Sequence, residues 1–248
     1  MADTAKIAWK SVTVRFGRQT VLNGLDLEAY EGRSLVVIGG SGSGKSVTLK
    51  TALGLIAPDA GQVMVDGRAV RPGHEDDPGV AQIGMLFQSG ALFDSLPVWK
   101  NIAFRLLHRD HMAADEARER ALEALDQVDL DAEVADKRPS QLSGGMLKRA
   151  ALARAIAARP KILFFDEPTT GLDPVTADLI NKLIDRQVKH LGATAVSITH
   201  DMASMHAIAD DVAMIKDGAI LWRGPLADVD SCASAEVCRF VRGQSEAS

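Results

Sequence analysis

The N-terminal third of the chain alternates apolar and polar residues with the two-residue period of β-strands. The segments KIAWKSVTVRF and TVLNGLDLEAYEG show this alternation and predict strands separated by turns. The apolar run SLVVIG predicts a buried parallel strand that leads into a glycine-rich turn. KSVTLKTALGLI then predicts a helix ending before Pro58. GQVMVDGRAV predicts a hairpin turning at Asp66 and Gly67, and AQIGMLFQ predicts another strand.

The pattern changes between residues 89 and 141. The segment HMAADEARERALEALDQV is rich in alanine and charge and has a helical period. It places Ala117, Ala121, Leu125 and Val128 on one face. This region predicts an inserted helical subdomain whose charged face is solvated.

An α/β pattern returns at Lys161. KILFFDE predicts a buried strand, and ATAVSITH predicts the next one. Between them, DPVTADLINKLIDRQVKHLG predicts a helix with Asp173 as N-cap, Pro174 in its first turn and Gly192 past its end. DVAMIKDGAILWRG predicts a hairpin turning at Asp217 and Gly218. The tail EVCRFVRGQSEAS predicts a short amphipathic segment. The fold class expected from the whole pattern is α/β.

Composition limits the classes of function. The 248 residues are 46% hydrophobic and 25% charged, which suits one large domain or a core with a subdomain. A net charge of −5 provides no basic field for nucleic acid. Two cysteines, Cys232 and Cys238, favour a reducing compartment. The N-terminus has no apolar core of a secretory leader, and no run approaches the roughly 18 apolar residues of a membrane span. Work at a membrane would therefore require a partner.

The octapeptide GGSGSGKS matches the phosphate-binding pattern G-x-x-x-x-G-K-[ST] between a predicted strand and a predicted helix. Glycines let backbone N–H groups turn toward phosphate oxygens, and the helix adds its positive N-terminal end. The predicted nucleotide-binding set is Gly39, Gly40, Ser41, Gly42, Ser43, Gly44, Lys45, Ser46 and Val47. Lys45 would reach the β- and γ-phosphates, and Ser46 would hold Mg²⁺. The plain alternative is a glycine-rich turn without a ligand.

Two adjacent carboxylates end the strand ILFFDE. Asp166 is placed to hold the Mg²⁺ shell through water, and Glu167 to orient an attacking water as general base. Taken alone, two carboxylates at the end of a strand usually just face solvent. Because these two lie downstream of a phosphate-binding loop, they indicate that the strand end belongs to the nucleotide site of that loop.

A second glycine pair lies in LSGGMLKRAALARA. Ser143, Gly144 and Gly145 stand at the start of a predicted helix, without the lysine of a phosphate loop. This geometry suits the γ-phosphate of a nucleotide held by another element. An ordinary N-cap with small residues for close packing is the alternative.

The order of phosphate loop, Gln88, LSGG, FFDEPTTGLDP and His200 resembles the ATPase subunit of ABC transporters over nearly the whole chain. The resemblance implies a RecA-like P-loop core with an N-terminal antiparallel β portion (residues 1–88 and 142–230), a helical subdomain (89–141) and a tail (231–248). It makes Gln88 the Q-loop residue that senses Mg²⁺ and the γ-phosphate. Asp173 becomes the D-loop aspartate at a dimer seam, and His200 the switch histidine on the γ-phosphate.

In this family two subunits pair head to tail, so the LSGG of one copy closes over the ATP on the P-loop of the other. The resemblance therefore implies a second copy of the chain, an integral membrane permease, and a place at the cytoplasmic face of the inner membrane. It implies ATP and Mg²⁺ as cofactors, with hydrolysis only in the dimer. The implied catalytic residues are Lys45, Gln88, Glu167 and His200, and the implied metal ligands are Ser46, Gln88 and Asp166.

Two positions depart from or modify the family pattern. Phe16 stands where the family places an aromatic residue, often tyrosine, to stack on adenine; a strand core residue is the alternative, and Trp9 is a less favoured stacking residue. Met146 replaces the usual glutamine after LSGG and cannot make the amide's hydrogen bonds. Because the backbone donors of residues 143–145 remain, hydrolysis is expected to survive.

The segment QSGALFDSLPVWKNIAF and the signature helix together resemble the ATPases of MCE/Mla-type lipid transporters. Leu92, Phe93, Leu96, Val98 and Trp99 are apolar enough to receive a coupling helix of the permease, although part of this set is expected in the subdomain's own core. The apolar tail residues Val237, Phe240 and Val241 are compatible with that group. The implied further partners are an MCE-domain protein and in some systems a STAS-domain protein, with phospholipid handled by the partners.

Three other functions compete with this interpretation. A small-solute importer, for example of amino acids, would use the same ATPase. A non-transport ABC ATPase of translation or DNA repair commonly has two units on one chain or a long coiled-coil insertion, and the acidic balance disfavours nucleic acid. A nucleotide sensor without hydrolysis is disfavoured by Glu167 and His200.

Overall fold

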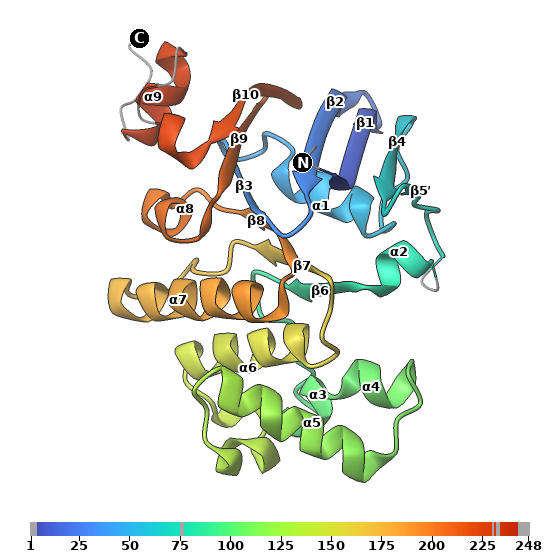
Figure 1. The fold of residues 1–248 in the computed structure, drawn as a ribbon, viewed down its shortest axis with the longest axis vertical. Coiled ribbons are helices and arrows are strands. Elements are labelled where there is room, and N and C mark those ends of the chain that lie inside the picture. Colours follow the sequence, from blue (N-terminus) through green and yellow to red (C-terminus); the bar gives the residue numbers. More distant parts are fainter. Residues whose placement is uncertain (1–3, 75–76, 230, 232–233, 243–248) are drawn as a thin grey trace. The chain divides into compact units, whose positions relative to one another are not determined.

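The computed structural model describes residues 4–74, 77–229, 231 and 234–242, and Figure 1 labels its elements. The chain forms two compact units, residues 1–83 with 194–248 and residues 84–193. The division predicted from the family, with limits after residues 88, 141 and 230, stays a prediction. Of the tail, Cys232 and residues 243–248 lie outside the described residues.

The first unit contains the predicted antiparallel sheet. Its strands lie in the order β2-β1-β4-β5 and pair antiparallel. They are β1 (Ala5–Phe16), β2 (Gln19–Tyr30), β4 (Ala60–Val65) and β5 (Arg68–Ala69). The predicted hairpin between β4 and β5 turns at Asp66 and Gly67, whose φ values of 49° and 70° are the positive values that both central residues of a type I′ turn adopt.

Four more strands of this unit follow the order β10-β9-β3-β8. They are β3 (Ser34–Ile38), β8 (Thr194–Ile198), β9 (Asp211–Lys216) and β10 (Ala219–Pro225). The apolar run at β3 pairs parallel with both β8 and β9 and is buried from Leu35 to Ile38, as predicted. The short helices of this unit are α1 (Lys45–Ala52), α2 (Pro78–Ala81), α8 (Met202–Ile208), η3 (Leu226–Asp228) and α9 (Ala235–Val241).

Two predicted boundaries are wrong. The helix expected to continue almost to Pro58 ends at Ala52. Gly54 adopts φ 68°, its N–H bonds to Thr51 O, and Leu55 N bonds to Lys50 O. These two bonds form a Schellman cap, which stops a helix at a left-handed glycine. The strand expected from Ala81 begins only at Ile83, because Ala81 closes the helical turn α2.

Trp9 is a core residue and not an adenine-stacking residue. Its side chain is 1% exposed, and its Nε1–H donates to Thr48 O at 3.0 Å and to Thr51 Oγ1 at 3.2 Å. The indole therefore packs β1 on α1 with its polar atom satisfied. Its burial thus excludes Trp9, the less favoured of the two candidates for stacking on adenine.

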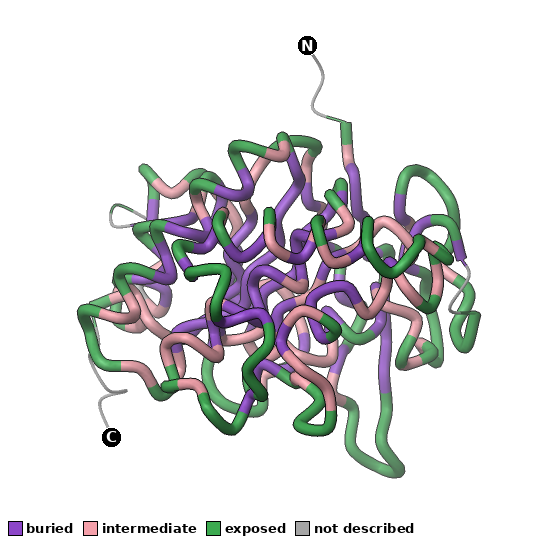
Figure 2. The backbone as a smooth tube through the Cα atoms, turned by 90° about the horizontal axis from the view of Figure 1, so that it is seen from below, coloured by how far each residue is buried: buried purple, intermediate pink, exposed green. Residues whose placement is uncertain are grey.

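The second unit is mainly helical. It contains the strand β7 (Ile162–Asp166) and all of β6 (Ile83–Leu86) except Ile83. The two strands are neighbours in the sheet. Its helices are α3 (Val98–Ile102), α4 (Phe104–His108), α5 (Ala114–Gln127), η1 (Ala132–Asp136), η2 (Pro139–Gln141), α6 (Gly144–Ile156) and α7 (Pro174–Leu191). The face predicted for α5 is fully buried at Ala117, Ala121 and Leu125, where α5 packs against α3 and α6. Figure 2 draws buried residues in purple.

Candidate functional site

The phosphate-binding loop connects β3 to α1 in the first unit, as predicted. Gly39 and Gly44 adopt φ values of 153° and 107°, where side chains are strained. A Cβ on Gly39 would lie 2.4 Å from Ile215 O, and one on Gly44 would lie 2.6 Å from Leu22 Cδ2. These two positions require glycine, because the loop passes against the backbone of β9 and the side chains of β2.

Lys45 is buried within this loop. Its Nζ donates to Gly39 O at 2.8 Å and to Gly40 O at 2.9 Å, so the ammonium lies at the loop's own carbonyl groups. Ser46 and Val47 follow in the first turn of α1. A cation and a helix N-terminus at one glycine loop are the donors that a nucleotide's phosphates need. The residues present therefore fit ATP.

The strand register brings His200 to the same edge as the phosphate loop. Val37 of β3 pairs with Ile198 of β8, so Gly39 and His200 each leave the sheet two residues later. His200 is exposed at the start of the turn into α8, which Asp201 caps by accepting from Ala203 N and Ser204 N. Neighbouring parallel strands thus place the two predicted phosphate contacts side by side.

Phe16 lies at the end of β1 and is 51% exposed. The alternative that it is a strand core residue is therefore wrong. Its Cα partner is Gln19 of β2, which lines a cavity of about 410 Å³ together with the outer part of the phosphate loop. Phe16 is thus an exposed aromatic residue paired with a residue that lines the cavity, and its ring is free of the core for stacking on a planar base.

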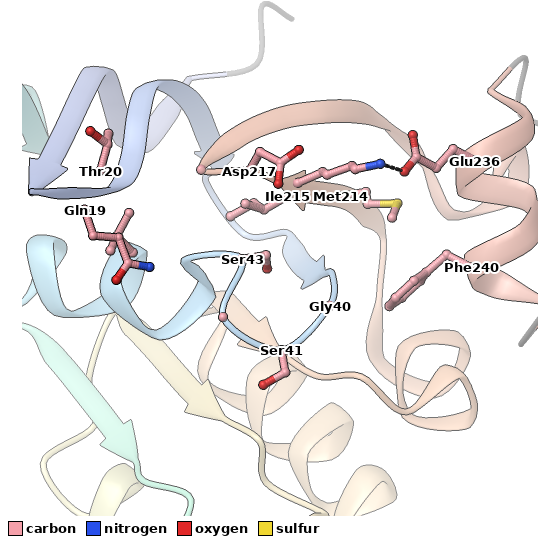
Figure 3. Close-up of a pocket in the computed structure, with 14 residues that line it drawn as sticks. Gln19, Thr20, Gly40, Ser41, Ser43, Met214, Ile215, Asp217, Glu236 and Phe240 are labelled. Carbon is pink, nitrogen blue, oxygen red and sulfur yellow. Dashed lines mark hydrogen bonds and ion pairs between the residues drawn. The ribbon is translucent and has the colours of Figure 1, made fainter. Parts of the chain in front are cut away.

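The same cavity is bordered by the C-terminal helix α9, as Figure 3 shows. Glu236 of α9 pairs with Lys216 of β9, and Phe240 forms part of the wall. The Oγ of Ser43, which also lines the cavity, is buried and has no hydrogen-bond partner among the described residues. No local pattern predicted that the tail lies beside the phosphate loop, since the two segments are far apart in the chain.

In the second unit, β7 ends on Asp166, and Glu167 follows with φ 49°. This left-handed conformation is uncommon for a residue other than glycine and turns the chain sharply after the strand. Thr170 holds the turn: its Oγ1 donates to Glu167 Oε2 at 2.6 Å, and its N–H donates to Glu167 O at 3.3 Å. Thr170 thereby orients the predicted general base, a contact that sequence reasoning missed.

Ser143 caps α6, and its Oγ accepts from Met146 N at 3.3 Å. Ser143 is thus the N-cap that the sequence analysis gave as the alternative to phosphate binding, and Met146 contributes its backbone N–H to the cap. The two glycines that follow differ. A Cβ on Gly145 would lie 2.9 Å from Thr176 Cγ2 of α7, whereas one on Gly144 would meet nothing within 4 Å. Gly145 thus allows close packing, and Gly144 faces open space.

Asp173 caps α7 as predicted. Its Oδ1 accepts from Val175 N at 3.1 Å and Thr176 N at 3.0 Å, and its Oδ2 accepts from Thr176 Oγ1 at 2.6 Å. These hydrogen bonds, led by the one from the Thr176 hydroxyl, lower the pKa of Asp173 below its ordinary value of 3.8.

We expect Asp173→Ala to lower the melting temperature, because two N–H groups of α7 lose their acceptor. Asp173→Asn keeps an acceptor and is expected to retain most of the stability. A depressed folded pKa stabilises the fold above the unfolded value of 3.8 and loses that contribution as pH falls through the folded pKa. Thermal unfolding of the three proteins as a function of pH checks this: the difference between wild type and Asp173→Ala should shrink only at acid pH. A constant difference at all pH values would contradict the lowered pKa of Asp173.

Gln88 follows β6, and its backbone carbonyl accepts a hydrogen bond from Lys148 of α6. In the segment after it, Phe93 is 46% exposed, Leu92, Leu96 and Trp99 are half-buried, and Val98 is buried. The buried Asn101 holds this loop: it accepts from Phe93 N and donates to Phe93 O, Leu96 O and Pro97 O. The segment is thus an ordered apolar surface, with Val98 in the core.

The predicted residues fall into two sets, one in each unit. The first unit holds Phe16, the phosphate loop, Ser46 and His200, and the second holds Gln88, residues 143–145, Asp166, Glu167 and Asp173. Among the described residues, no group of three His, Cys, Asp or Glu side chains could hold a metal ion. The donors predicted for Mg²⁺ include one carboxylate, which suits an ion that takes its remaining ligands from phosphates and water. In the described part of the chain, every helix is too short or too polar to cross a membrane.

Comparisons with known proteins agree with this geometry. A family model described as "ABC transporter" matches residues 22–170. The intermembrane phospholipid transport system ATP-binding protein MlaF of Haemophilus influenzae is 35% identical over 96% of this chain and 90% of its own length. The sulfate/thiosulfate import ATP-binding protein CysA of Caulobacter vibrioides is 39% identical over 95% of this chain and 69% of its own. A dimeric ATP-binding cassette in a post-hydrolysis state, bound to ADP and Pi, superposes with a TM-score of 0.78 and 32% identity over 89% of this chain and 98% of its own.

Proposed function

The chain belongs to the ABC transporter ATP-binding family and is an ATPase of that family, and we propose that it energises phospholipid transport across the cell envelope. In this proposal two copies pair head to tail and bind a membrane permease at the cytoplasmic face of the inner membrane. An MCE-domain protein, with or without a STAS-domain protein, completes the system. The similarity to MlaF over 96% of the chain is the observation that carries the choice of lipid.

In this proposal the hydrolytic roles are those that the resemblance to the family implies. Lys45 binds the β- and γ-phosphates, and the partner's signature serine closes over the same nucleotide. Ser46, Gln88 and Asp166 would hold Mg²⁺, which supplies positive charge to the phosphate oxygens. Glu167, oriented by Thr170, accepts the proton of the attacking water, and His200 contacts the γ-phosphate. Positioning and charge stabilisation carry most of such a reaction.

The segment from Leu92 to Trp99 is the proposed contact with the permease. Its apolar side chains are partly exposed, and Asn101 holds its backbone in place. An ordered apolar loop suits the docking of an amphipathic helix.

A small-solute importer is the second candidate, supported by the sulfate/thiosulfate relative at 39% identity. Affinity purification of the chain from its native membranes in mild detergent, followed by mass spectrometry of proteins and lipids, separates the two. A permease recovered with an MCE-domain protein and phospholipid would support the lipid assignment. A permease recovered with a solute-binding protein would replace it and leave the ATPase assignment intact.

Phe16→Ala is expected to raise the Kd for ATP by roughly 5- to 100-fold, because base–aromatic stacking is worth about 1–3 kcal/mol. Phe16→Tyr keeps the aromatic face and should bind ATP like the wild type. Titration with a fluorescent ATP analogue measures both, with Leu221→Ala as the control for loss of an exposed apolar side chain. An unchanged Kd in Phe16→Ala would remove Phe16 from the nucleotide site.

A further inference from the structure

Lys148 occupies an unusual place for a lysine. It lies on α6 among the fully buried alanines 150, 151 and 153, and it is only 6% exposed. Burying an ammonium is costly unless opposite charge and hydrogen-bond acceptors compensate. Burial lowers the pKa of Lys148, and the charges of Asp166 and Glu167 oppose that shift. Its position therefore needs a reason beyond the packing of an alanine-rich helix.

The partners of Lys148 come from three separate motifs. Its Nζ donates to the backbone carbonyl of Gln88, which follows β6. The negative charges of Asp166, which ends β7, and of Glu167, which follows it, oppose the lowering of the Lys148 pKa. Lys148 itself lies in the helix that the signature Ser143 caps. One ammonium thus stands among the Q-loop residue, the carboxylate pair and the signature helix, all within the second unit.

Arg154 provides a comparison on the same helix. Its Nη1 donates to Ala91 O at 2.5 Å, and its Nη2 donates to Gly90 O at 3.0 Å. Arg154 and Lys148 therefore fasten consecutive parts of one loop to α6. Burial alone lowers the pKa of Arg154, without any contribution from a carboxylate, whereas the charges of Asp166 and Glu167 act on Lys148. Substituting each cation in turn therefore distinguishes the contact with Gln88 from the general anchoring of the loop after it.

We infer that Lys148 is a positioning residue for ATP hydrolysis, which holds the backbone of Gln88 against the signature helix α6. The inference rests on the proposed function. A lysine suits the task because its compact ammonium offers three donors to acceptors on different sides.

The test is a series at position 148 in the full-length chain, measured by phosphate release at saturating Mg²⁺ and varied ATP. Lys148→Met keeps the apolar stem and removes charge and donors. We expect kcat to fall roughly 10- to 100-fold, the usual cost of losing a residue that orients active-site ligands, with KM for ATP within about threefold of wild type. Lys148→Arg restores a cation and should recover most of kcat.

Two matched controls lie on α6. Arg154→Met removes the neighbouring loop anchor and should change kcat by less than about threefold. Arg149→Met removes a partly exposed arginine that donates to Asp129 O and should behave like wild type. If Lys148→Met does not fold, Lys148→Gln still tests the inference, because it removes the charge and keeps an N–H donor, although one bond closer to the backbone.

The outcomes separate the inference from the proposed function. A loss confined to kcat in the Met or Gln variant, with rescue by Arg, supports the inference. Wild-type kcat in these variants, an equal loss in Arg154→Met, or a loss that appears in KM alone overturns it. A wild-type chain that binds ATP and releases no phosphate, alone or with its permease, would instead refute the proposed function.

Discussion

Glu167→Gln is expected to lower ATP turnover by about 10²- to 10⁴-fold, the range for loss of a general base, while ATP binding persists. The substitution is nearly isosteric, and the amide oxygen can still accept the Thr170 hydroxyl that holds this side chain at 2.6 Å. Only the ability to take a proton is lost. Because the nucleotide then stays bound and uncleaved, the variant should accumulate as an ATP-loaded dimer.

Phosphate release measures the turnover, and size-exclusion chromatography with light scattering, with and without ATP, measures the dimer. Glu119→Gln is the matched control, since Glu119 is an exposed glutamate of α5. Turnover at the wild-type level in Glu167→Gln would refute the assigned base. Loss of ATP binding in the variant would show instead that Glu167 supports the fold of the site.

Two inactive variants should recover activity when they are mixed. Lys45→Ala removes the cation of the phosphate loop, and Gly144→Glu puts a carboxylate where the partner's γ-phosphate is proposed to bind. Each variant alone is expected to lose roughly 10²-fold or more of its turnover, the typical cost of removing one charge-stabilising group. In a head-to-tail mixed dimer, both defects fall in one site and the other site is intact. Random pairing then gives up to about a quarter of wild-type turnover.

Gly144→Glu is expected to leave the stability of the fold unchanged. A Cβ there meets nothing within 4 Å, and an acidic residue in the first turn of a helix is favourable. Lys50→Ala, an exposed position on α1, is the control for the lysine change. If mixed dimers form, as seen with two different affinity tags, and turnover stays at the level of the parents, each site lies within one copy and the shared arrangement is wrong.

The sequence alone determined the fold class and most elements. The glycine loop between β3 and α1 and the caps at Ser143 and Asp173 occur where local patterns predicted them. The P-loop ATPase fold and the family are confirmed by the matching family model and by the similar solved cassettes. These features were predictable because phosphate loops, caps and hairpin turns are encoded by residues close together in the chain.

Only the tertiary structure decided which of the two aromatic residues is exposed and can stack on the adenine base of a nucleotide. Trp9 and Phe16 lie on the same strand, but β1 packs Trp9 on α1 and leaves Phe16 half exposed. The placement of α9 against the phosphate-loop cavity, the turn that Thr170 holds at Glu167, and the hydrogen bond from Lys148 to Gln88 were decided in the same way. Except for the short Thr170 turn, these depend on contacts between segments dozens of residues apart. Local periodicity states which face of an element is apolar, whereas the neighbour that covers each residue is set by packing of the whole unit.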